Sequence, residues 1–211
     1  MPGLIHGLEA GVIRANLERV RERAGAGVEI LAATKYIPAD EMGALLEAGA
    51  TLVGENRLQD LERKQERWPD GLTWDFIGNL QSRKVKQLLP RVRLIHSVAS
   101  DSALDQLGRH APPGTEVLVE VNLAGEESKG GISPDGLGEF IDRCPVTVSG
   151  LMTMPPFTQT PEQSRPYFAR LAGLAAEHRL SRLSMGTSQD WEVALEEGAT
   201  ILRLGTTLYG G

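Results

Sequence analysis

The sequence predicts an α/β fold, a single (β/α)8 barrel of the TIM type with an N-terminal helix in the eighth helical position, as one domain over residues 1–211. Short apolar segments alternate with helical patterns, and each connection is too long for a hairpin, which favours parallel strands. Eight such strands close into a barrel. An open doubly wound sheet is the alternative, but it usually has fewer strands and begins with a glycine-rich phosphate turn, unlike Leu31–Pro38.

The first element is an amphipathic helix over Leu4–Ala24, because its apolar residues recur at helical spacing and Gly-Ala-Gly follows it. Eight apolar segments are the predicted strands: Val28–Thr34, Thr51–Val53, Thr73–Ile77, Val92–His96, Thr115–Asn122, Val146–Met152, Arg182–Ser184 and Ala199–Gly205. The segments between them are the predicted helices: Pro38–Ala50, Leu58–Arg67, Gln81–Leu89, Asp101–His110, Pro134–Arg143, Pro161–His178 and Asp190–Glu197. No helix is expected after the last strand, so the N-terminal helix would complete the ring.

The composition narrows the functional classes. The 22 Lys and Arg residues against 28 Asp and Glu give a net charge of −6, which argues against a chain built mainly to neutralise nucleic-acid phosphates. The single cysteine, Cys144, fits a reducing compartment, and four scattered histidines do not favour a metal site. Neither a membrane-spanning apolar run nor a leader is recognised, so we expect a complete cytoplasmic protein, monomeric by default.

Polar residues at the ends of the predicted strands carry the functional prediction, because barrels place their chemistry at this end. Ser188 is expected to cap the helix after the seventh strand, and Gly205 lets the backbone approach a ligand after the eighth. Free backbone N–H groups at such positions bind anions, and barrels commonly hold phosphate at strands 7 and 8. We therefore predict a phosphate site formed by Ser188, Gly205 and Thr206; the alternative is ordinary helix caps and turns.

Lys35 ends the first predicted strand. One interpretation is a solvated strand terminus, and the other is an amine that adds to an aldehyde and forms a Schiff base. Combined with a phosphate site across the barrel mouth, the second interpretation implies a ligand with an aldehyde at one end and a phosphate at the other. Pyridoxal 5′-phosphate satisfies both requirements.

Eight short motifs, taken in order, resemble one family: ATKY, GEN, FIGNLQSRK, IHSVAS, ESKGGI, GLMTM, SMGTSQDWEVAL and RLGTTLYG. Together they are similar to the pyridoxal-phosphate homeostasis proteins, also called the YggS/PROSC family, whose fold is similar to the N-terminal barrel of alanine racemase. The resemblance runs from about residue 10 to the C-terminus. Each motif is weak alone, and the specificity lies in their order.

The resemblance implies a set of cofactor-binding residues: Lys35 as the lysine of the aldimine, Ser188, Gly205 and Thr206 at the phosphate, Asn56 beside the cofactor, and Arg203 facing the pyridine nitrogen. The family usually reads Ser-Met/Leu-Gly-Met-Ser where this chain has residues 184–188. Thr187 therefore departs from the pattern, whereas the hydroxyl of Ser188 is kept.

Arg203 bears on the type of activity. An arginine at the pyridine nitrogen leaves that nitrogen unprotonated and weakens carbanion stabilisation, and 211 residues leave no room for the second domain of related racemases. We therefore expect no catalytic residues and no substantial turnover. The resemblance implies instead a carrier that buffers and delivers the cofactor, with apoenzymes as acceptors, and that maintains vitamin B6 and amino-acid and keto-acid balance. A fold-type III amino-acid racemase and a Schiff-base aldolase acting on a sugar phosphate are the alternatives.

Four further features carry smaller predictions. Tyr36 should point away from Lys35, because neighbouring strand residues face opposite sides. His96 is expected to donate a hydrogen bond at a strand end. The basic cluster Arg83, Lys84 and Lys86 is either a solvated face or a docking surface for an acidic acceptor. The glycine-rich loop that contains Lys129 is either a solvated connection with no role in release or a gate over the cofactor.

Overall fold

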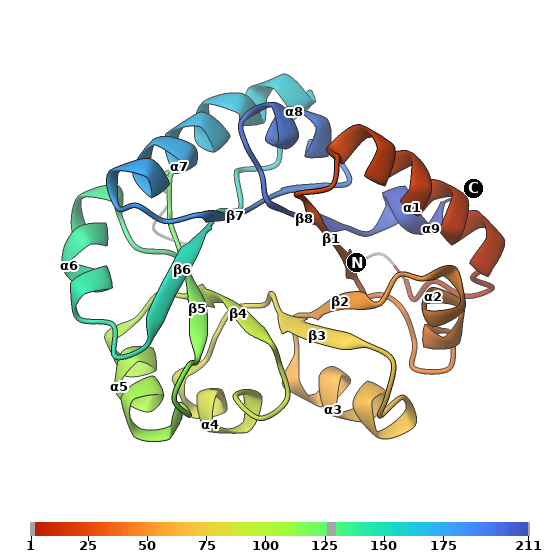
Figure 1. The fold of residues 1–211 in the computed structure, drawn as a ribbon, viewed down its shortest axis with the longest axis horizontal. Coiled ribbons are helices and arrows are strands. Elements are labelled where there is room, and N and C mark those ends of the chain that lie inside the picture. Colours follow the sequence, from red (N-terminus) through yellow and green to blue (C-terminus); the bar gives the residue numbers. More distant parts are fainter. Residues whose placement is uncertain (1–2, 126–129, 211) are drawn as a thin grey trace.

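The computed structural model describes residues 3–125 and 130–210. Its strands are β1 (Glu29–Ala33), β2 (Leu52–Glu55), β3 (Thr73–Phe76), β4 (Leu94–Val98), β5 (Glu116–Glu120), β6 (Thr147–Met152), β7 (Arg182–Thr187) and β8 (Ile201–Leu204). They pair in parallel in chain order, and β8 pairs with β1 to close the barrel. Figure 1 looks into this barrel, with the strands in the centre and the helices around them. The predicted TIM-type fold is confirmed.

The helices alternate with the strands along the chain. They are α1 (Ala10–Ala24), α2 (Met42–Ala48), α3 (Leu58–Arg67), α4 (Val85–Leu88), α5 (Asp101–His110), α6 (Leu137–Asp142), α7 (Arg165–Glu177), α8 (Trp191–Glu196) and α9 (Thr206–Tyr209). Local sequence sets several of their starts. The Ser100 hydroxyl caps α5, and Thr160 and Gln163 form a capping box around Pro161 at the turn that leads into α7.

Helix α1 occupies the ring between α8 and α2, as expected (Figure 1). It begins at Ala10 and not at Leu4, because the preceding segment is held by Glu41, the residue just before α2. Gly7 has a positive φ of 71°, and the backbone N–H groups of Gly7 and Leu8 donate to the Glu41 carboxylate. These contacts satisfy the backbone without helical bonds, so the apolar pattern predicted the helix but not its start.

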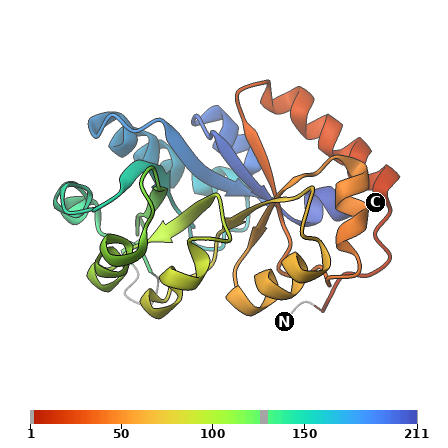
Figure 2. The same ribbon diagram turned by 60° about the horizontal axis from the view of Figure 1, so that its bottom comes forward.

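The prediction that no helix follows the last strand is wrong. The single-turn helix α9 follows β8 and packs against α1, and Figures 1 and 2 show α1, α2 and α9 side by side. The Asn16 side chain of α1 donates hydrogen bonds to the carbonyl groups of Leu208 (3.1 Å) and Gly210 (2.8 Å). One turn is too short to produce a helical apolar pattern, which is why the sequence did not reveal it.

The barrel interior has an apolar layer with polar side chains above it. Five buried apolar residues from different strands form the layer: Leu31, Leu94, Leu118, Met152 and Ile201. Residues two positions further along a strand face the same side, so several polar groups lie above this layer, toward the C-terminal ends of the strands. A larger apolar core fills the space between the strands and the helices.

Two further observations concern predicted features. None of the helices in the described ranges is both long and apolar enough to cross a membrane. Lys129, for which a gate and a solvated connection are the two interpretations, lies outside the described residues.

Candidate functional site

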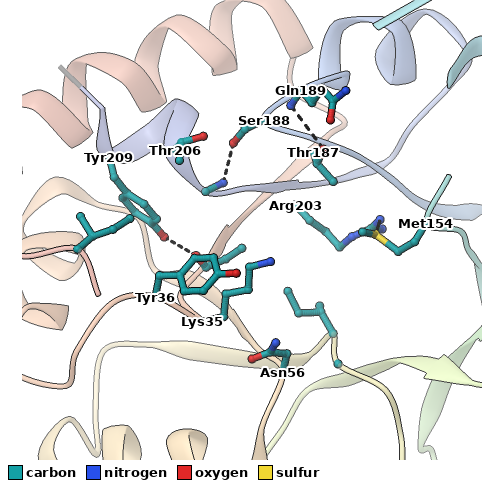
Figure 3. Close-up of a pocket in the computed structure, with 15 residues that line it drawn as sticks. Lys35, Tyr36, Asn56, Met154, Thr187, Ser188, Gln189, Arg203, Thr206 and Tyr209 are labelled. Atoms are coloured by element: carbon teal, nitrogen blue, oxygen red, sulfur yellow. Dashed lines mark hydrogen bonds between the residues drawn. The ribbon is translucent and has the colours of Figure 1, made fainter. Parts of the chain in front are cut away.

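A cavity of about 410 Å³ opens at the C-terminal ends of the strands. All six predicted cofactor-binding residues line it, namely Lys35, Asn56, Ser188, Arg203, Gly205 and Thr206. They come from β1, β2, β7, β8 and the segments that follow these strands (Figure 3). The fold therefore brings together residues that are up to 171 positions apart in the sequence, from Lys35 to Thr206.

Lys35 lies in a turn just after β1, where the N–H of Ile37 donates to the Thr34 carbonyl. Its Nζ is 4.8 Å from the centroid of the Tyr36 ring. The prediction that Tyr36 points away from Lys35 is wrong, because β1 ends at Ala33 and the alternation of a strand does not extend into the turn. Within the described residues, Lys35 has no hydrogen bond or ion pair, so its amine is available to a ligand.

Ser188 lies opposite Lys35 in the cavity and connects two loops (Figure 3). Its Oγ accepts hydrogen bonds from the backbone N–H groups of Gly205 (3.0 Å) and Thr207 (3.1 Å). The prediction that Ser188 caps the helix after β7 is wrong: α8 begins after Asp190, and Ser188 binds the start of α9 instead. The hydroxyl groups of Ser188 and Thr206 and the backbone at Gly205 therefore lie together at this end of the cavity.

A bulge at the end of β7 directs Ser188 toward this position. The pairing with β8 shifts register between Ser184 and Thr187, and Gly186 within the bulge has a φ of 87°. A Cβ at Gly186 would lie only 2.6 Å from the Ala194 Cβ, so a larger residue is excluded. Thr187 has a local role, since its backbone N–H and its hydroxyl both donate to Asp190 Oδ1 and fix the loop.

Asn56 reaches the cavity because two loops approach closely. A Cβ at Gly78 would lie 2.2 Å from the Asn56 carbonyl oxygen, so only glycine permits this contact. Beneath Asn56 lies a buried ion pair between Glu55 and Lys64, which Thr34 supports through a hydroxyl bond to Glu55 (2.6 Å). This cluster supports the wall of the cavity that Asn56 and Lys35 share.

Arg203 is buried at the base of the cavity. Its guanidinium donates to Ser184 Oγ (2.6 Å), to the Thr153 carbonyl (2.9 Å) and to Met154 Sδ (2.9 Å). Burial lowers the pKa of Arg203 to about 10, although Asp190 and Glu120 oppose this shift. The guanidinium is therefore still charged at neutral pH and acts only as a hydrogen-bond donor.

Sequence reasoning missed several polar groups around Arg203. Asp75 and Ser184 lie in the middle of strands, and Glu120 ends β5 above the apolar layer, where burial raises its pKa against the attraction of Arg203. His96 lies within β4 and not at a strand end, because β4 continues to Val98. Strand parity was the available signal, since an isolated polar residue two positions from an inward apolar one must face inward.

Two tyrosines also line the cavity. The Tyr209 hydroxyl donates to the Ala33 carbonyl (3.1 Å), and burial raises its pKa, with Glu55 adding to the shift. Tyr209 therefore stays protonated and bonded to the wall of the cavity, while the ring of Tyr36 lies beside the amine of Lys35.

The residues of the cavity fit pyridoxal 5′-phosphate. The side chains supply an amine for an aldehyde, a group of donors for a phosphate and a guanidinium for a ring nitrogen, all in one cavity. A ligand with only an aldehyde, or with only an anionic group, would not require the amine, the phosphate donors and the guanidinium together.

Comparisons with known proteins identify the family. The model of the alanine racemase N-terminal domain matches residues 9–211. A pyridoxal phosphate homeostasis protein of Aquifex aeolicus is 43% identical over 214 residues, covering 92% of this chain and 94% of the relative. The structure of PipY from Synechococcus elongatus with PLP bound has a TM-score of 0.83 and 31% identity, covering 94% of this chain and 100% of that chain.

More distant structures share only the fold. Alanine racemase from Corynebacterium glutamicum has a TM-score of 0.74 at 15% identity, and the match covers 97% of this chain but 61% of that chain. The resemblance predicted from the short motifs is confirmed. The chain belongs to the family of pyridoxal phosphate homeostasis proteins, built on the alanine racemase N-terminal barrel.

Proposed function

We propose that this chain, as one domain over residues 1–211, binds pyridoxal 5′-phosphate and buffers and delivers it, and so maintains vitamin B6 and amino-acid and keto-acid homeostasis. The observation that carries the proposal is the pairing of the Lys35 amine with the Ser188 end of the same cavity. The relatives named as homeostasis proteins and the PLP-bound PipY structure support it.

Each predicted residue has a distinct task. Lys35 would hold the cofactor covalently, since its neutral amine can condense with the aldehyde carbon while the aldehyde oxygen leaves as water. Ser188, the backbone at Gly205 and Thr206 would bind the phosphate, Asn56 would contact the ring, and Arg203 would donate a hydrogen bond to the ring nitrogen; all of them line the cavity. When bound, the cofactor supplies an electrophilic aldehyde and a ring that can withdraw electrons.

Arg203 is the reason for proposing a carrier without substantial turnover. A guanidinium whose pKa stays near 10 keeps its proton at neutral pH, so the ring nitrogen accepts a hydrogen bond and gains no charge. A neutral ring withdraws electrons weakly and stabilises a carbanion poorly. The names of the relatives as homeostasis proteins support the same conclusion.

The racemase alternative requires an acid or base on each face of a substrate. Lys35 supplies one candidate, and the nearest tyrosines are Tyr36, against the lysine, and Tyr209. Tyr209 donates its hydroxyl proton to the Ala33 carbonyl, and burial raises its pKa, so it is a poor base. We therefore favour the carrier over the racemase.

Delivery to pyridoxal-phosphate-dependent apoenzymes and a cytoplasmic location complete the proposal. The basic cluster lies beside the site, since Arg83 and Lys84 line a second cavity together with Asn56. An acceptor that docked there would approach the mouth of the cofactor cavity.

Binding and turnover measured on one preparation test the proposed function. We expect one equivalent of bound cofactor with visible absorbance, transfer of that cofactor to an acceptor apoenzyme, and no conversion between L- and D-alanine. Rapid racemisation would favour the fold-type III racemase. Absence of a visible chromophore together with cleavage of a sugar phosphate would favour the aldolase.

A further inference from the structure

Four buried polar side chains form a continuous hydrogen-bonded chain across the barrel interior. Asp75 on β3 and His96 on β4 are joined by a bond of 3.0 Å between Oδ2 and Nε2. His96 Nδ1 then lies 2.9 Å from the Oγ of Ser184 on β7, which accepts a hydrogen bond from Arg203 on β8 (2.6 Å). None of the four is more than 5% exposed. The chain connects two neighbouring strands on one side of the barrel to two on the other.

Asp75 and Arg203, the two ends of this hydrogen-bonded chain, determine where each proton lies. Burial would raise the pKa of Asp75, but the hydrogen bonds from His96 and Arg93 more than offset this, so Asp75 is a carboxylate that only accepts. The proton of His96 is therefore on Nε2. Arg203 only donates, so the Ser184 oxygen accepts from Arg203 and its own proton points to His96 Nδ1. Burial lowers the pKa of His96 despite its bond to Asp75, and the ring is neutral.

Ser184 is the central link, because a hydroxyl can accept and donate at the same time. Its loss would leave both His96 Nδ1 and one N–H of Arg203 without a partner. Of the five N–H groups of Arg203, three have partners within the described residues: one on Ser184, one on the Thr153 carbonyl and one on Met154 Sδ. The two remaining N–H groups, on Nε and Nη1, have no partner within the described residues, and Arg203 lines the cavity.

We propose that Ser184, oriented by His96 and Asp75, is a positioning residue that holds Arg203 for its hydrogen bond to the ring nitrogen of the ligand. The inference deepens the proposed function and rests on it, since it assigns Arg203 to the ring. Asp75, His96 and Ser184 do not line the cavity. Together they determine how the Arg203 guanidinium presents its donors to the ligand. A purely structural role of Ser184 would affect every ligand of the cavity equally.

A ligand pair separates these two roles. Dissociation constants are measured for pyridoxal 5′-phosphate and for its deaza analogue, in which the ring nitrogen is replaced by CH. Ser184→Ala should weaken binding of pyridoxal 5′-phosphate about tenfold, which corresponds to the loss of one hydrogen bond involving a charged group. Binding of the deaza analogue should change little, because it offers Arg203 no acceptor.

Two variants serve as controls. Ser149→Ala removes a buried strand hydroxyl that has no hydrogen-bond partner among the described residues, and it should change neither dissociation constant. Ser184→Thr retains the hydroxyl and should restore most of the affinity for pyridoxal 5′-phosphate. An equal loss for both ligands in Ser184→Ala, or no loss for either, would overturn the inference.

A measurement without ligand tests the hydrogen-bonded chain from Asp75 to Arg203 itself. In a variant with His6, His110 and His178 replaced by Gln, His96 is the only histidine, and its ¹⁵N spectrum should show one tautomer with the proton on Nε2. Adding Ser184→Ala should keep this tautomer, because Asp75 still accepts from Nε2, but should shift the ¹⁵N resonance of Nδ1, which loses its hydrogen bond from Ser184. A mixture already present with Ser184 in place would overturn the inference. A protein that shows a single tautomer but binds neither pyridoxal 5′-phosphate nor its deaza analogue would overturn the proposed function. The proposed hydrogen bond from Arg203 to a ring nitrogen would then be overturned as well.

Discussion

Lys35 Nζ lies 4.8 Å from the centroid of the Tyr36 ring, within the distance at which a cation and an aromatic face attract each other. Both residues line the cavity in which the cofactor is proposed to bind. The ring thus restricts where the amine can lie before an aldehyde reaches it. The contact exists because the two residues occupy a turn and not a strand.

Replacement of Tyr36 tests the importance of this contact. Tyr36→Phe keeps the ring face and should retain cofactor affinity, whereas Tyr36→Leu removes it and should weaken affinity a few-fold, since such contacts are worth about 0.5–1 kcal/mol at exposed sites. Dissociation constants from absorbance titrations measure both effects. Equal affinities of the two variants would show that the ring face does not matter.

The buried Glu55–Lys64 pair makes a prediction for stability. Lys64→Met would leave the carboxylate of Glu55 buried without its cation, which should lower the free energy of unfolding by about 3–5 kcal/mol. Denaturant unfolding measures the loss. The double variant Glu55→Gln/Lys64→Met should recover much of it, and Lys86→Met, at an exposed lysine, should change stability by less than about 0.5 kcal/mol. A single Lys64→Met variant as stable as the Lys86→Met control would contradict the account.

The buried His96 predicts how stability depends on pH. Burial lowers its pKa in the folded protein, so the unfolded chain binds a proton more readily once the pH falls below about 6.5. The free energy of unfolding should therefore decrease as the pH is lowered from about 6.5, by up to about 1.4 kcal/mol per pH unit for one proton. Asp75, whose pKa is lowered by His96 and Arg93 against the effect of burial, adds a further loss below about pH 4.

Unfolding curves of two histidine variants isolate this contribution. His96→Gln should flatten the dependence between about pH 6.5 and 5, whereas His110→Gln, at an exposed position, should leave it as in the unaltered protein. If the free energy of unfolding of His96→Gln still decreases with falling pH over this range, the decrease comes from a group other than His96.

The proposed phosphate end predicts a difference between two ligands. Pyridoxal lacks the phosphate and should bind about 100-fold more weakly than pyridoxal 5′-phosphate, because hydrogen bonds to a charged group are worth about 1.5–3 kcal/mol each. Ser188→Ala, which removes a hydroxyl from this end of the cavity, should reduce the ratio of the dissociation constants of pyridoxal and pyridoxal 5′-phosphate. Equal affinities for the two ligands in the unaltered protein would refute a phosphate site.

Much of the fold could be predicted because a repeated apolar pattern encodes it. Segments such as Thr115–Asn122 are long enough to show a strand, and α3 and α5 have the predicted bounds. Features that depend on one or two residues were missed. The start of α1 depends on the Glu41 carboxylate, and α9 is a single turn held by Asn16.

The candidate site divides along similar lines. Lys35 and Ser188 could be found because a residue at a strand end in a barrel must lie at its mouth. The hydrogen-bond partner of Ser188 could not be found from the sequence, because the bulge at Gly186 determines which helix the Ser188 hydroxyl reaches. The chain from Asp75 to Arg203 joins strands that are distant in sequence, and only the closed barrel brings them together.

The identity of the lysine that bonds to the cofactor tests the central claim most directly. The protein is loaded with pyridoxal 5′-phosphate, reduced with borohydride and digested, and the labelled peptide is identified by mass spectrometry. We predict a single label on Lys35, and no reducible chromophore in a Lys35→Ala variant that unfolds at the same denaturant concentration as the unaltered protein. A chromophore that persists in Lys35→Ala, with the label on another lysine, would contradict the account.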